Sequence, residues 1–515
     1  MREKIQKLRA KRQKVTEGGG AKAIEKQHAA GKLTARERLG YLLDPDTFME
    51  THRFVRHRCT NFGMAGKDFP GEGVVTGHGL VGSRPVYVAS QDFTVAGGSL
   101  GEAGAFKITE IMDLALKTGA PFVFINDGAG ARIQEGVQSL AGYGRIFYRN
   151  VLLSGVVPQI SIIAGACAGG AAYSPALTDF IIQVRKAGQM YITGPSVIKE
   201  VTGEEVTTEQ LGGVECHASY SGVVHLVAET GEEGMALARR LLSFLPNNNT
   251  ESPPRYASGA DAMVALDDSL NDVVPVDPRK PYDMREVITR IVDQGDFLEI
   301  QSAFAPNILI GFGRVLGQTV GIVANQPCVR AGVLDIDASD KSARFVRFCN
   351  AFNIPIVTLV DVPGFLPGIR QEIGGIIRHG AKMLFAYAAS TVPKITIIVR
   401  KAYGGAYLAM CGRDLGADKV AAWPTGEIAV MGAAGAVNIL YREQIKDAAD
   451  PAAERKARMT EYEDQFATPF EAAAAGLIDD IIEPAETRAY IATSLEFLAN
   501  KRELRPQKKH GLIPL

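Results

Sequence analysis

The chain repeats a stretch of its own sequence at a nearly constant spacing. "VVPQISIIAGACAGGAAY" (156–173) aligns without a gap on "TVPKITIIVRKAYGGAYL" (391–408), at an offset of 235 residues. "GAPFVFINDGAG" (119–130) aligns on "NIPIVTLVDVPG" (353–364) at an offset of 234, and a third pair of segments further upstream matches with one gap. Similar blocks in one order at one spacing indicate an internal duplication. The chain is therefore predicted to contain two copies of one fold.

The length of the chain, 515 residues, is also more than one ordinary hydrophobic core holds. Between the two copies, "LPNNNTESPPRYASGADA" (245–262) is rich in Asn, Pro and Ser and has neither a helical nor a strand period, which is typical of a linker. We therefore predict a first domain over residues 1–250, a linker over 251–274 and a second domain over 275–515.

Within each copy, short apolar runs alternate with helical patterns such as "GAFKITEIMDLALKTG" (104–119) and "SDKSARFVRFCNAF" (339–352). Helices that cross between strands predict an α/β fold with a largely parallel sheet. The uncharged stretch "SIIAGACAGGAAYSPAL" (161–177) is interrupted by several glycines and by Pro175. These breakers favour a buried strand that runs into a turn over a membrane span.

Composition narrows the functional classes. The net charge is −1, so no global field draws the chain to nucleic acid or to an anionic membrane. The six cysteines form no CxxC pair, which argues against a zinc ribbon, a disulfide framework or any metal site in this chain. The charged N-terminal segment carries acidic residues and no apolar core for secretion, so a cytoplasmic location is expected.

Both copies place Gly-Gly-Ala between a buried strand and a helical pattern, in "CAGGAAYSPAL" and "AYGGAYLAMCG". Glycine lets a ligand approach the main chain closely, and the first amides of a helix point at it without an intrahelical partner. Two such amides can hold a developing oxyanion, each contributing about 3–4 kcal/mol in a dry site. The alternative is that these glycines only allow a strand and a helix to pack closely.

Other candidate residues carry weaker signals. Asp127 and Asp361 end their strands and could either cap the next segment or line a site. Arg132 could meet a phosphate or pair with a carboxylate. No Ser/His/Asp set, dinucleotide fingerprint or P-loop is present in the sequence. Two oxyanion sites without an evident nucleophile suit chemistry in which the ligands supply the reactive groups, and enolate chemistry on thioesters is one case.

Several motifs resemble those of the carboxyltransferase (β) subunits of biotin-dependent acyl-CoA carboxylases. The resemblance runs essentially from end to end, and its motifs include "SQDFTVAGGSLGE", "GARIQEGV", "YSPALTDF", "ITGPSVIKEVTGE", "DVPGFLPG", "GGIIRHGAK" and "RKAYGGAY". The nearest types are propionyl-CoA carboxylase β, the α subunit of methylmalonyl-CoA decarboxylase and the large subunit of transcarboxylase.

The resemblance implies two tandem crotonase-like domains and a homohexameric core. It implies transfer of CO2 from carboxybiotin to the α-carbon of a short acyl-CoA, converting propionyl-CoA to methylmalonyl-CoA. Acyl-CoA is expected mainly on the first domain and biotin on the second domain of a neighbouring subunit. Biotin and the ATP-dependent step are expected on partners, a biotin carboxylase and a biotin carboxyl carrier, because this chain has no biotinyl-lysine motif.

The same resemblance assigns roles to individual residues. It implies that the main-chain amides of Gly169 and Gly170 stabilise an oxyanion on the acyl-CoA, and those of Gly405 and Ala406 one on biotin. The further expected residues are Arg132, Ala166, Tyr173 and Leu408 for the substrate, and Tyr407, Gly374 and Gly375 for the cofactor.

Three departures from the family pattern bear on the substrate. The chain has "DGAGAR" (127–132) and "GACAGG" (165–170) where the family usually has "DSGGAR" and "GPCAGG", which leaves the thioester site wider or softer. It has Leu408 where propionyl-specific members typically carry Asp.

Two alternative functions stay open. One is the same half-reaction run from methylmalonyl-CoA, in a decarboxylase or transcarboxylase. The other is a scaffold that binds CoA without turnover.

Overall fold

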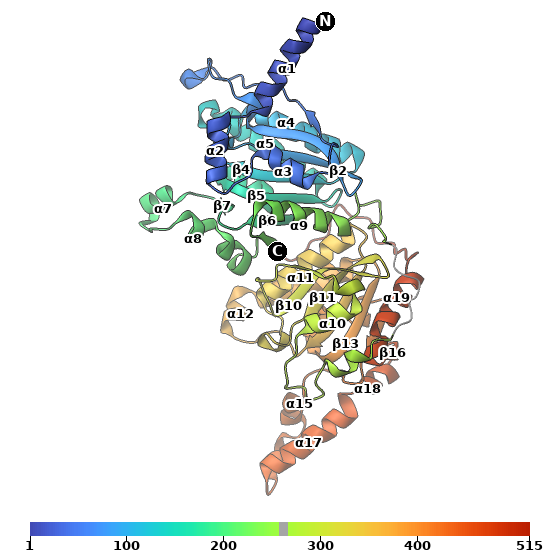
Figure 1. Ribbon diagram of the computed structural model, residues 1–515. Coiled ribbons are helices and arrows are strands. Elements are labelled where there is room, and N and C mark those ends of the chain that lie inside the picture. The colour runs from blue at the N-terminus through green and yellow to red at the C-terminus, as the bar shows by residue number, and fades with distance from the viewer. Residues whose placement is uncertain (257–265) are drawn as a thin grey trace. The chain divides into compact units, whose positions relative to one another are not determined.

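The computed structural model describes residues 1–256 and 266–515 and divides into two compact units. Unit 1 spans Met1–Ser252 and unit 2 spans Pro253–Leu515 (Figure 1). The division falls inside the segment predicted to be a linker, 251–274, of which residues 257–265 lie outside the described part. The functional roles expected of the two domains stay predictions.

Unit 1 contains one sheet and the helices that pack on it. Its strands are β1 (Met49–Thr51), β2 (Val74–Val81), β3 (Arg84–Gln91), β4 (Phe122–Gly128), β5 (Gln159–Ala168), β6 (Phe180–Val184), β7 (Gln189–Tyr191) and β8 (Leu226–Ala228). Its α-helices are α1 (Arg2–Thr16), α2 (Ala21–Ala29), α3 (Ala35–Leu42), α4 (Glu102–Thr118), α5 (Val137–Leu153), α6 (Tyr173–Ala176), α7 (Pro195–Thr202), α8 (Thr208–Gly212) and α9 (Gly231–Phe244).

Unit 2 has the same kinds of element. Its strands are β9 (Leu298–Ile300), β10 (Ile308–Val315), β11 (Gln318–Asn325), β12 (Ile356–Val362), β13 (Lys394–Tyr403), β14 (Lys419–Ala422), β15 (Glu427–Ala429) and β16 (Asp480–Ile481). Its α-helices are α10 (Met284–Ile291), α11 (Ile336–Ala351), α12 (Ile369–Gly374), α13 (Ile376–Ala389), α14 (Gly404–Ala409), α15 (Ala433–Leu440), α16 (Arg442–Asp447), α17 (Pro451–Phe466), α18 (Pro469–Ala474) and α19 (Thr487–Phe497).

The two sheets have the same topology. Sheet order is β1-β2-β3-β4-β5-β6-β8 in unit 1, with β7 beside β5, and β9-β10-β11-β12-β13-β14-β16 in unit 2, with β15 beside β13. The first three strands of each sheet are antiparallel, and the pairings from β3 and from β11 onward are parallel. The matching order confirms both the largely parallel α/β fold and the duplication.

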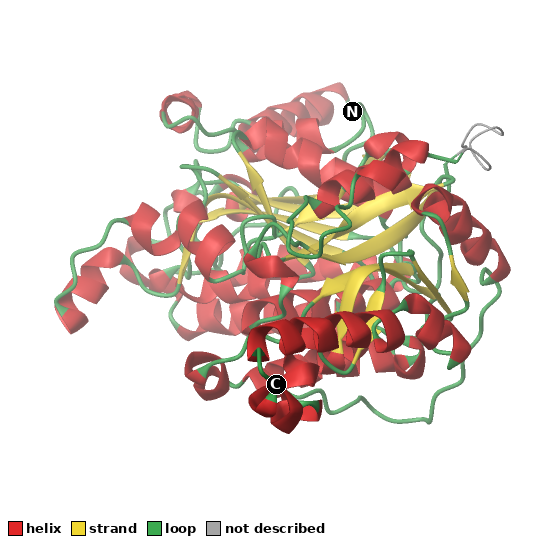
Figure 2. Ribbon diagram, turned by 90° about the horizontal axis from the view of Figure 1, so that it is seen from below, coloured by secondary structure: helices red, strands yellow, loops and turns green. Residues whose placement is uncertain are grey.

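The central strands of each sheet are buried on both faces. Every residue of β4, β6 and β12 is buried, which is the pattern of parallel strands covered by helices on both sides. In unit 1, α4 packs on β2 and β3, while α9 packs on β5, β6 and β8. Figure 2 shows the strands enclosed by helices. In the described part of the chain, no helix combines the length and apolar character needed to cross a bilayer.

Candidate functional site

In unit 1, the predicted strand-to-helix turn lies at the carboxyl end of β5. Ala168 is still extended, Gly169 has φ +65°, and a short 3₁₀ turn (Gly169–Ala172) then leads into α6. A positive φ of this size is the left-handed region that glycine occupies without steric cost. Gly169 is therefore required by the backbone, whatever binds beside it.

Unit 2 makes the same turn at the carboxyl end of β13. Tyr403 is extended and Gly404, the counterpart of Gly169, has φ +56° and begins α14. A Cβ atom on Gly404 would also lie 2.8 Å from the carbonyl oxygen of Val430. The two copies thus reverse the chain by the same left-handed glycine.

The second glycine of each turn has a different reason to be there. Neither Gly170 nor Gly405 has a positive φ. A Cβ atom on Gly405 would have no neighbour within 4 Å, and one on Gly170 would only touch the ring of Tyr143 at 3.8 Å. Neither packing nor backbone strain excludes a side chain at these positions. Their bare main chain at the start of a helix instead leaves room for a ligand to reach unpaired amides.

The side chains predicted to bind ligands divide into exposed and buried ones. Tyr173 is 50% exposed and Leu408 is 41% exposed, each three residues beyond the open glycine of its own turn. Ala166, on β5, is partly exposed. Tyr407 is buried, its ring lies against Gly412, and burial raises its pKa to about 12. Tyr173 and Leu408 can therefore meet a ligand, whereas Tyr407 supports α14 from inside.

Gly374 is the last residue of α12, and Gly375 separates α12 from α13. Gly375 has φ +91°, and a Cβ atom on Gly374 would come within 2.6 Å of Ile336. Helix α13, which begins at this junction, packs on α14, the helix that carries Gly405. Their predicted contact with the cofactor stays a prediction.

Arg132 is held inside unit 1 by its own neighbours. Its guanidinium pairs with Glu72 and, at 2.8 Å, with Glu135, and it also donates to the carbonyl and hydroxyl oxygens of Ser99. Burial raises the pKa of Glu72, although the charge of Arg132 acts in the opposite direction. Of the two alternatives left open by the sequence, the structure displays the pairing with carboxylates. A ligand phosphate would have to displace these contacts.

Asp127 neither caps a helix nor faces an open site. It lies at a register shift between β4 and β5, and it accepts hydrogen bonds from Arg38 (2.7 Å), Lys32 (2.7 Å) and Gln27 (2.9 Å). A Cβ atom on Gly165 would lie 1.8 Å from its carboxylate. Glycine at 165 therefore makes room for a buried charge that the N-terminal arm of the chain neutralises.

Asp361 occupies the equivalent register shift between β12 and β13, but its partners differ. It accepts from the guanidinium of Arg400 (3.0 Å), the hydroxyl of Tyr282 (2.9 Å) and the amide of Lys401 (3.2 Å). Arg400 is the sequence counterpart of Gly165. In unit 2 the strand itself thus supplies the cation that unit 1 takes from a distant segment.

A pair of buried lysines escaped the sequence analysis. Lys107 on α4 donates to the carbonyl oxygens of Gly71 (2.7 Å) and Val74 (2.5 Å). Lys341, its counterpart on α11, contacts four carbonyl oxygens at 2.7–3.3 Å. Burial lowers the pKa of Lys107 to about 8 and that of Lys341 to about 7. A lysine on the apolar face of a helix, repeated at the 234-residue offset, was the available signal.

Chemically, the two turns provide main-chain donors with open space beside them. Among residues 1–256 and 266–515, no group of three or more His, Cys, Asp or Glu side chains is arranged to hold a metal ion. The arrangement suits stabilisation of negative charge on two bound molecules, one at each turn.

The comparisons agree with this geometry. A family model described as "Carboxyl transferase domain" matches residues 26–513. The α subunit of methylmalonyl-CoA decarboxylase from Propionigenium modestum is 59% identical over 512 residues, covering 99% of each chain. The propionyl-CoA carboxylase β chain of Saccharopolyspora erythraea is 55% identical over 523 residues, covering 99% of this chain and 96% of the relative.

A crystal structure gives the same result. The transcarboxylase 12S subunit, described as a hexamer assembly with methylmalonyl-CoA and methylmalonic acid bound, superposes with a TM-score of 0.98. It is 58% identical, and the match covers 100% of this chain and 98% of that one.

The repeated sheet and the paired glycine turns define a duplicated crotonase-like α/β enzyme. More narrowly, the chain belongs to the carboxyl transferase domain family and is a carboxyltransferase.

Proposed function

We propose that this chain moves a carboxyl group between biotin and the α-carbon of a short acyl-CoA, with propionyl-CoA and methylmalonyl-CoA as the acyl pair. The first hypothesis is carboxylation of propionyl-CoA. The second hypothesis is the reverse half-reaction, which moves the carboxyl group from methylmalonyl-CoA to biotin. Both are kept because relatives at 55–59% identity include a carboxylase chain and a decarboxylase chain. The two hypotheses involve the same microscopic steps and therefore the same site.

One observation carries this proposal. The same open glycine stands at the start of a helix in both units, at Gly170 and Gly405, where neither φ nor packing requires it. An enzyme that generates an enolate on a thioester and a charged ureido oxygen on a second ligand needs one such cradle for each. We assign the acyl-CoA to Gly169 and Gly170, and biotin to Gly405 and Ala406.

The residues of this chain would act by orientation and electrostatics. The amides at Gly170 would donate to the thioester oxygen as it becomes an enolate oxygen, while Tyr173 lies along the acyl chain. The amides at Gly405 would hold the second ligand, and Leu408, one helical turn away, would form an apolar wall against the acyl group. Biotin, carried by a partner, would supply the carboxyl group when bound beside Gly405 and Ala406, and the two turns would hold it and the acyl-CoA in position for the transfer.

Two apolar stripes support an assembly of several copies. In unit 1, Ile133, Val137 and Leu140 are 86%, 75% and 68% exposed, at the start of α5. In unit 2, three isoleucines of α12 and α13 are 75–81% exposed at the equivalent place: Ile369, Ile373 and Ile377. Large exposed apolar patches mark interfaces. We propose that these stripes are buried between copies in a hexamer like that described for the 12S relative, next to the two turns.

A direct test uses free biotin, so that no partner needs to be known. The purified chain is incubated with methylmalonyl-CoA and biotin, and formation of propionyl-CoA that depends on biotin is followed by mass spectrometry. Gly170→Ala and Gly405→Ala should each lower this rate at least tenfold, because a methyl group would occupy the space beside the amides. Removal of a single oxyanion donor costs roughly 10²–10³ in kcat elsewhere.

The matched control is Gly40→Ala on α3, where a Cβ atom also has no neighbour within 4 Å. It should leave the rate unchanged, and all three variants should melt at or above the temperature of the parent. Unchanged rates in both Gly170→Ala and Gly405→Ala would refute the assignment of the turns. Biotin-independent loss of CO2 would refute the role of biotin.

A further inference from the structure

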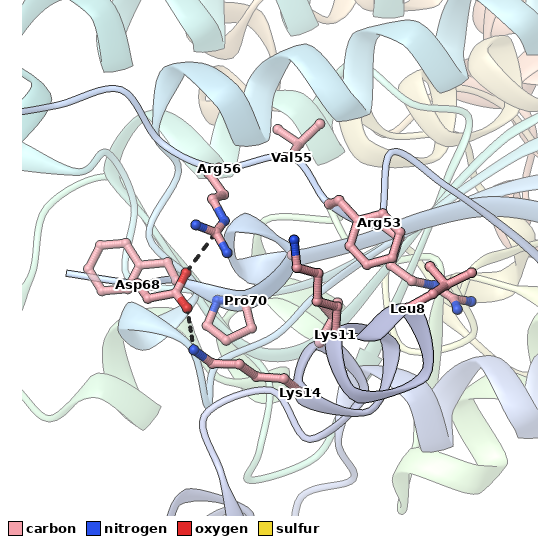
Figure 3. A pocket seen from close by; sticks show the side chains of 12 residues that line it. Leu8, Lys11, Lys14, Arg53, Val55, Arg56, Asp68 and Pro70 are labelled. Atoms are coloured by element: carbon pink, nitrogen blue, oxygen red, sulfur yellow. Dashed lines mark hydrogen bonds and ion pairs between the residues drawn. The ribbon is translucent and has the colours of Figure 1, made fainter. Parts of the chain in front are cut away.

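A concave site lies in unit 1, away from the glycine turn at Gly169 and Gly170. Its volume is about 440 Å³, and it lies between α1 and the segments 53–56 and 68–71 (Figure 3). Its floor is fixed, because the buried ammonium of Lys107 holds the carbonyl oxygen of Gly71 at 2.7 Å. One wall is fixed as well, since Arg53 pairs with the buried Glu50 at 2.6 Å.

The pocket is strongly basic. Lys11 and Lys14 of α1 and Arg53 and Arg56 of the opposite segment line it, against one carboxylate, Asp68. Lys14 and Arg56 approach Asp68 from two sides, at 2.6 Å and 3.9 Å (Figure 3). The hydrogen bond from Lys14 and the surrounding positive charge hold the pKa of Asp68 below its usual value. The carboxylate is therefore ionised at neutral pH and still leaves an excess of cations.

The pocket also has an apolar lining. Leu8 and Val15 of α1 and Phe54 and Phe69 of the facing segments contribute to it. Leu8 is 38% exposed and Phe54 is 48% exposed, so part of this surface is open to a partner. A ligand that fits must therefore combine negative charge with an apolar group.

Helix α1 is unfavourable on its own. It projects from unit 1, and none of its residues is buried (Figure 1). Its basic residues are Arg2, Lys4, Lys7, Arg9, Lys11, Arg12 and Lys14, against the single acid Glu3. Like charges three or four residues apart destabilise a helix by about 0.2–0.5 kcal/mol per pair, and cations in its first turn oppose the helix dipole. Anionic groups from outside would relieve this repulsion.

We propose that α1 and this pocket form a docking surface for an acidic segment of a partner protein. Carboxylates of the partner would pair with Lys11, Lys14 and Arg56, and one apolar side chain would enter the space beside Leu8 and Phe54. A protein segment fits better than nucleic acid, because the pocket is lined by Leu8, Phe54 and Phe69 as well as by cations, and a phosphate backbone has no apolar side chain to place against them.

The test measures binding of a labelled twelve-residue peptide, rich in Glu and Asp around one central Phe, to the full chain by fluorescence anisotropy. The double variant Lys11→Glu/Lys14→Glu should weaken binding at least tenfold. The control Lys4→Glu/Arg9→Glu changes the charge of the same helix equally but lies outside the pocket, and it should weaken binding less than threefold. A peptide with Ser in place of Phe should bind more weakly, and added salt should weaken both.

The neutral variant Lys11→Gln/Lys14→Gln should give an intermediate loss, which separates the effect from a folding defect. Carboxyl transfer with free biotin should be unchanged in all these variants. The proposal is overturned if the peptide does not bind or if both charge-reversal variants lose affinity equally. It is also overturned if Lys11 and Lys14 prove to be needed for binding a dT12 oligonucleotide, or for the number of copies in the assembly, and not for binding the peptide.

Discussion

Leu408 shows how one residue can adjust a site built from main-chain atoms. It lies on α14, three residues after Gly405, and is 41% exposed. Residues three apart on a helix share a face, so its side chain lies over the same side of α14 as the open glycine. The amides proposed to hold the acyl-CoA, at Gly169 and Gly170, would not distinguish one acyl group from another, because every thioester offers them the same oxygen. Selection among acyl groups would therefore come from side chains such as Leu408.

Leu408→Asp should change the preference among acetyl-, propionyl- and butyryl-CoA, because a charged group replaces the apolar wall. A methylene in an apolar pocket is typically worth about 1–3 kcal/mol, so ratios of kcat/KM should move roughly 10- to 200-fold. Leu408→Met keeps an apolar side chain of similar size and should preserve the parent profile. An unaltered profile in Leu408→Asp would mean that selection lies elsewhere.

At the scale of elements, the two buried lysines join a helix to a loop in each unit. Lys107 ties α4 to the segment before β2 and to the first residue of β2, and Lys341 ties α11 to the segment before β10 and to the first residue of β10. Each ammonium donates its hydrogen bonds to main-chain carbonyl oxygens. The ammonium donates the hydrogen bonds that these carbonyl oxygens would otherwise accept from water. Without it, the carbonyl oxygens are buried and have no donor.

Lys341→Met should therefore lower the free energy of unfolding by about 2–4 kcal/mol, since several buried acceptors lose their donor. Lys107→Met removes two acceptor contacts instead of four and should cost less. Lys456→Met on the surface of α17 is the matched control and should change stability little. Denaturant unfolding of the three variants measures their free energies of unfolding, which should rank in this order. A larger loss for Lys107→Met than for Lys341→Met would contradict the explanation.

Elements and turns were accessible from the sequence because their signals are local. The strand over 159–168 follows from an apolar run between breakers, and the turn that ends it follows from paired glycines between a strand and a helical pattern. The partners of Arg132 and Asp127 were not accessible. Glu72 and Arg38 are 60 and 89 residues away, and no local pattern reports which distant charge will meet a buried one.

The openness of Gly170 and Gly405 was not accessible either. A glycine required by a positive φ and a glycine required by a ligand look the same in a sequence. The structure distinguishes them: Gly404 has φ +56° and a Cβ atom on it would meet Val430, whereas Gly405 has no positive φ and open space beside it.

At the scale of the whole molecule, duplication yields two surfaces of the same kind. The apolar stripes on α5 and on α12 and α13 follow equivalent strands, β4 and β12. A monomer would expose both, which is costly in water. In the proposed assembly, association of copies would cover both stripes and would bring groups of a neighbouring copy close to α5 and α13.

Ile373→Glu should break the assembly, because it places a charge where an apolar contact is expected. Mass photometry should show smaller species, and carboxyl transfer should fall with the loss of assembly. The matched control is Val276→Glu, at a residue that is 82% exposed outside both stripes, and it should leave the assembly intact. An intact hexamer in Ile373→Glu would contradict the assigned interface.

The unequal neutralisation of Asp127 and Asp361 has a consequence for the order of folding. Arg400 reaches Asp361 across 39 residues, whereas Arg38 must reach Asp127 across 89. Closing the longer loop costs about 0.7 kcal/mol more in chain entropy, and early contacts favour short separations. During synthesis, Arg38 therefore has to wait for Asp127 until β4 and β5 have been made. In the second repeat, Asp361 can be neutralised as soon as β13, which carries Arg400, has been made.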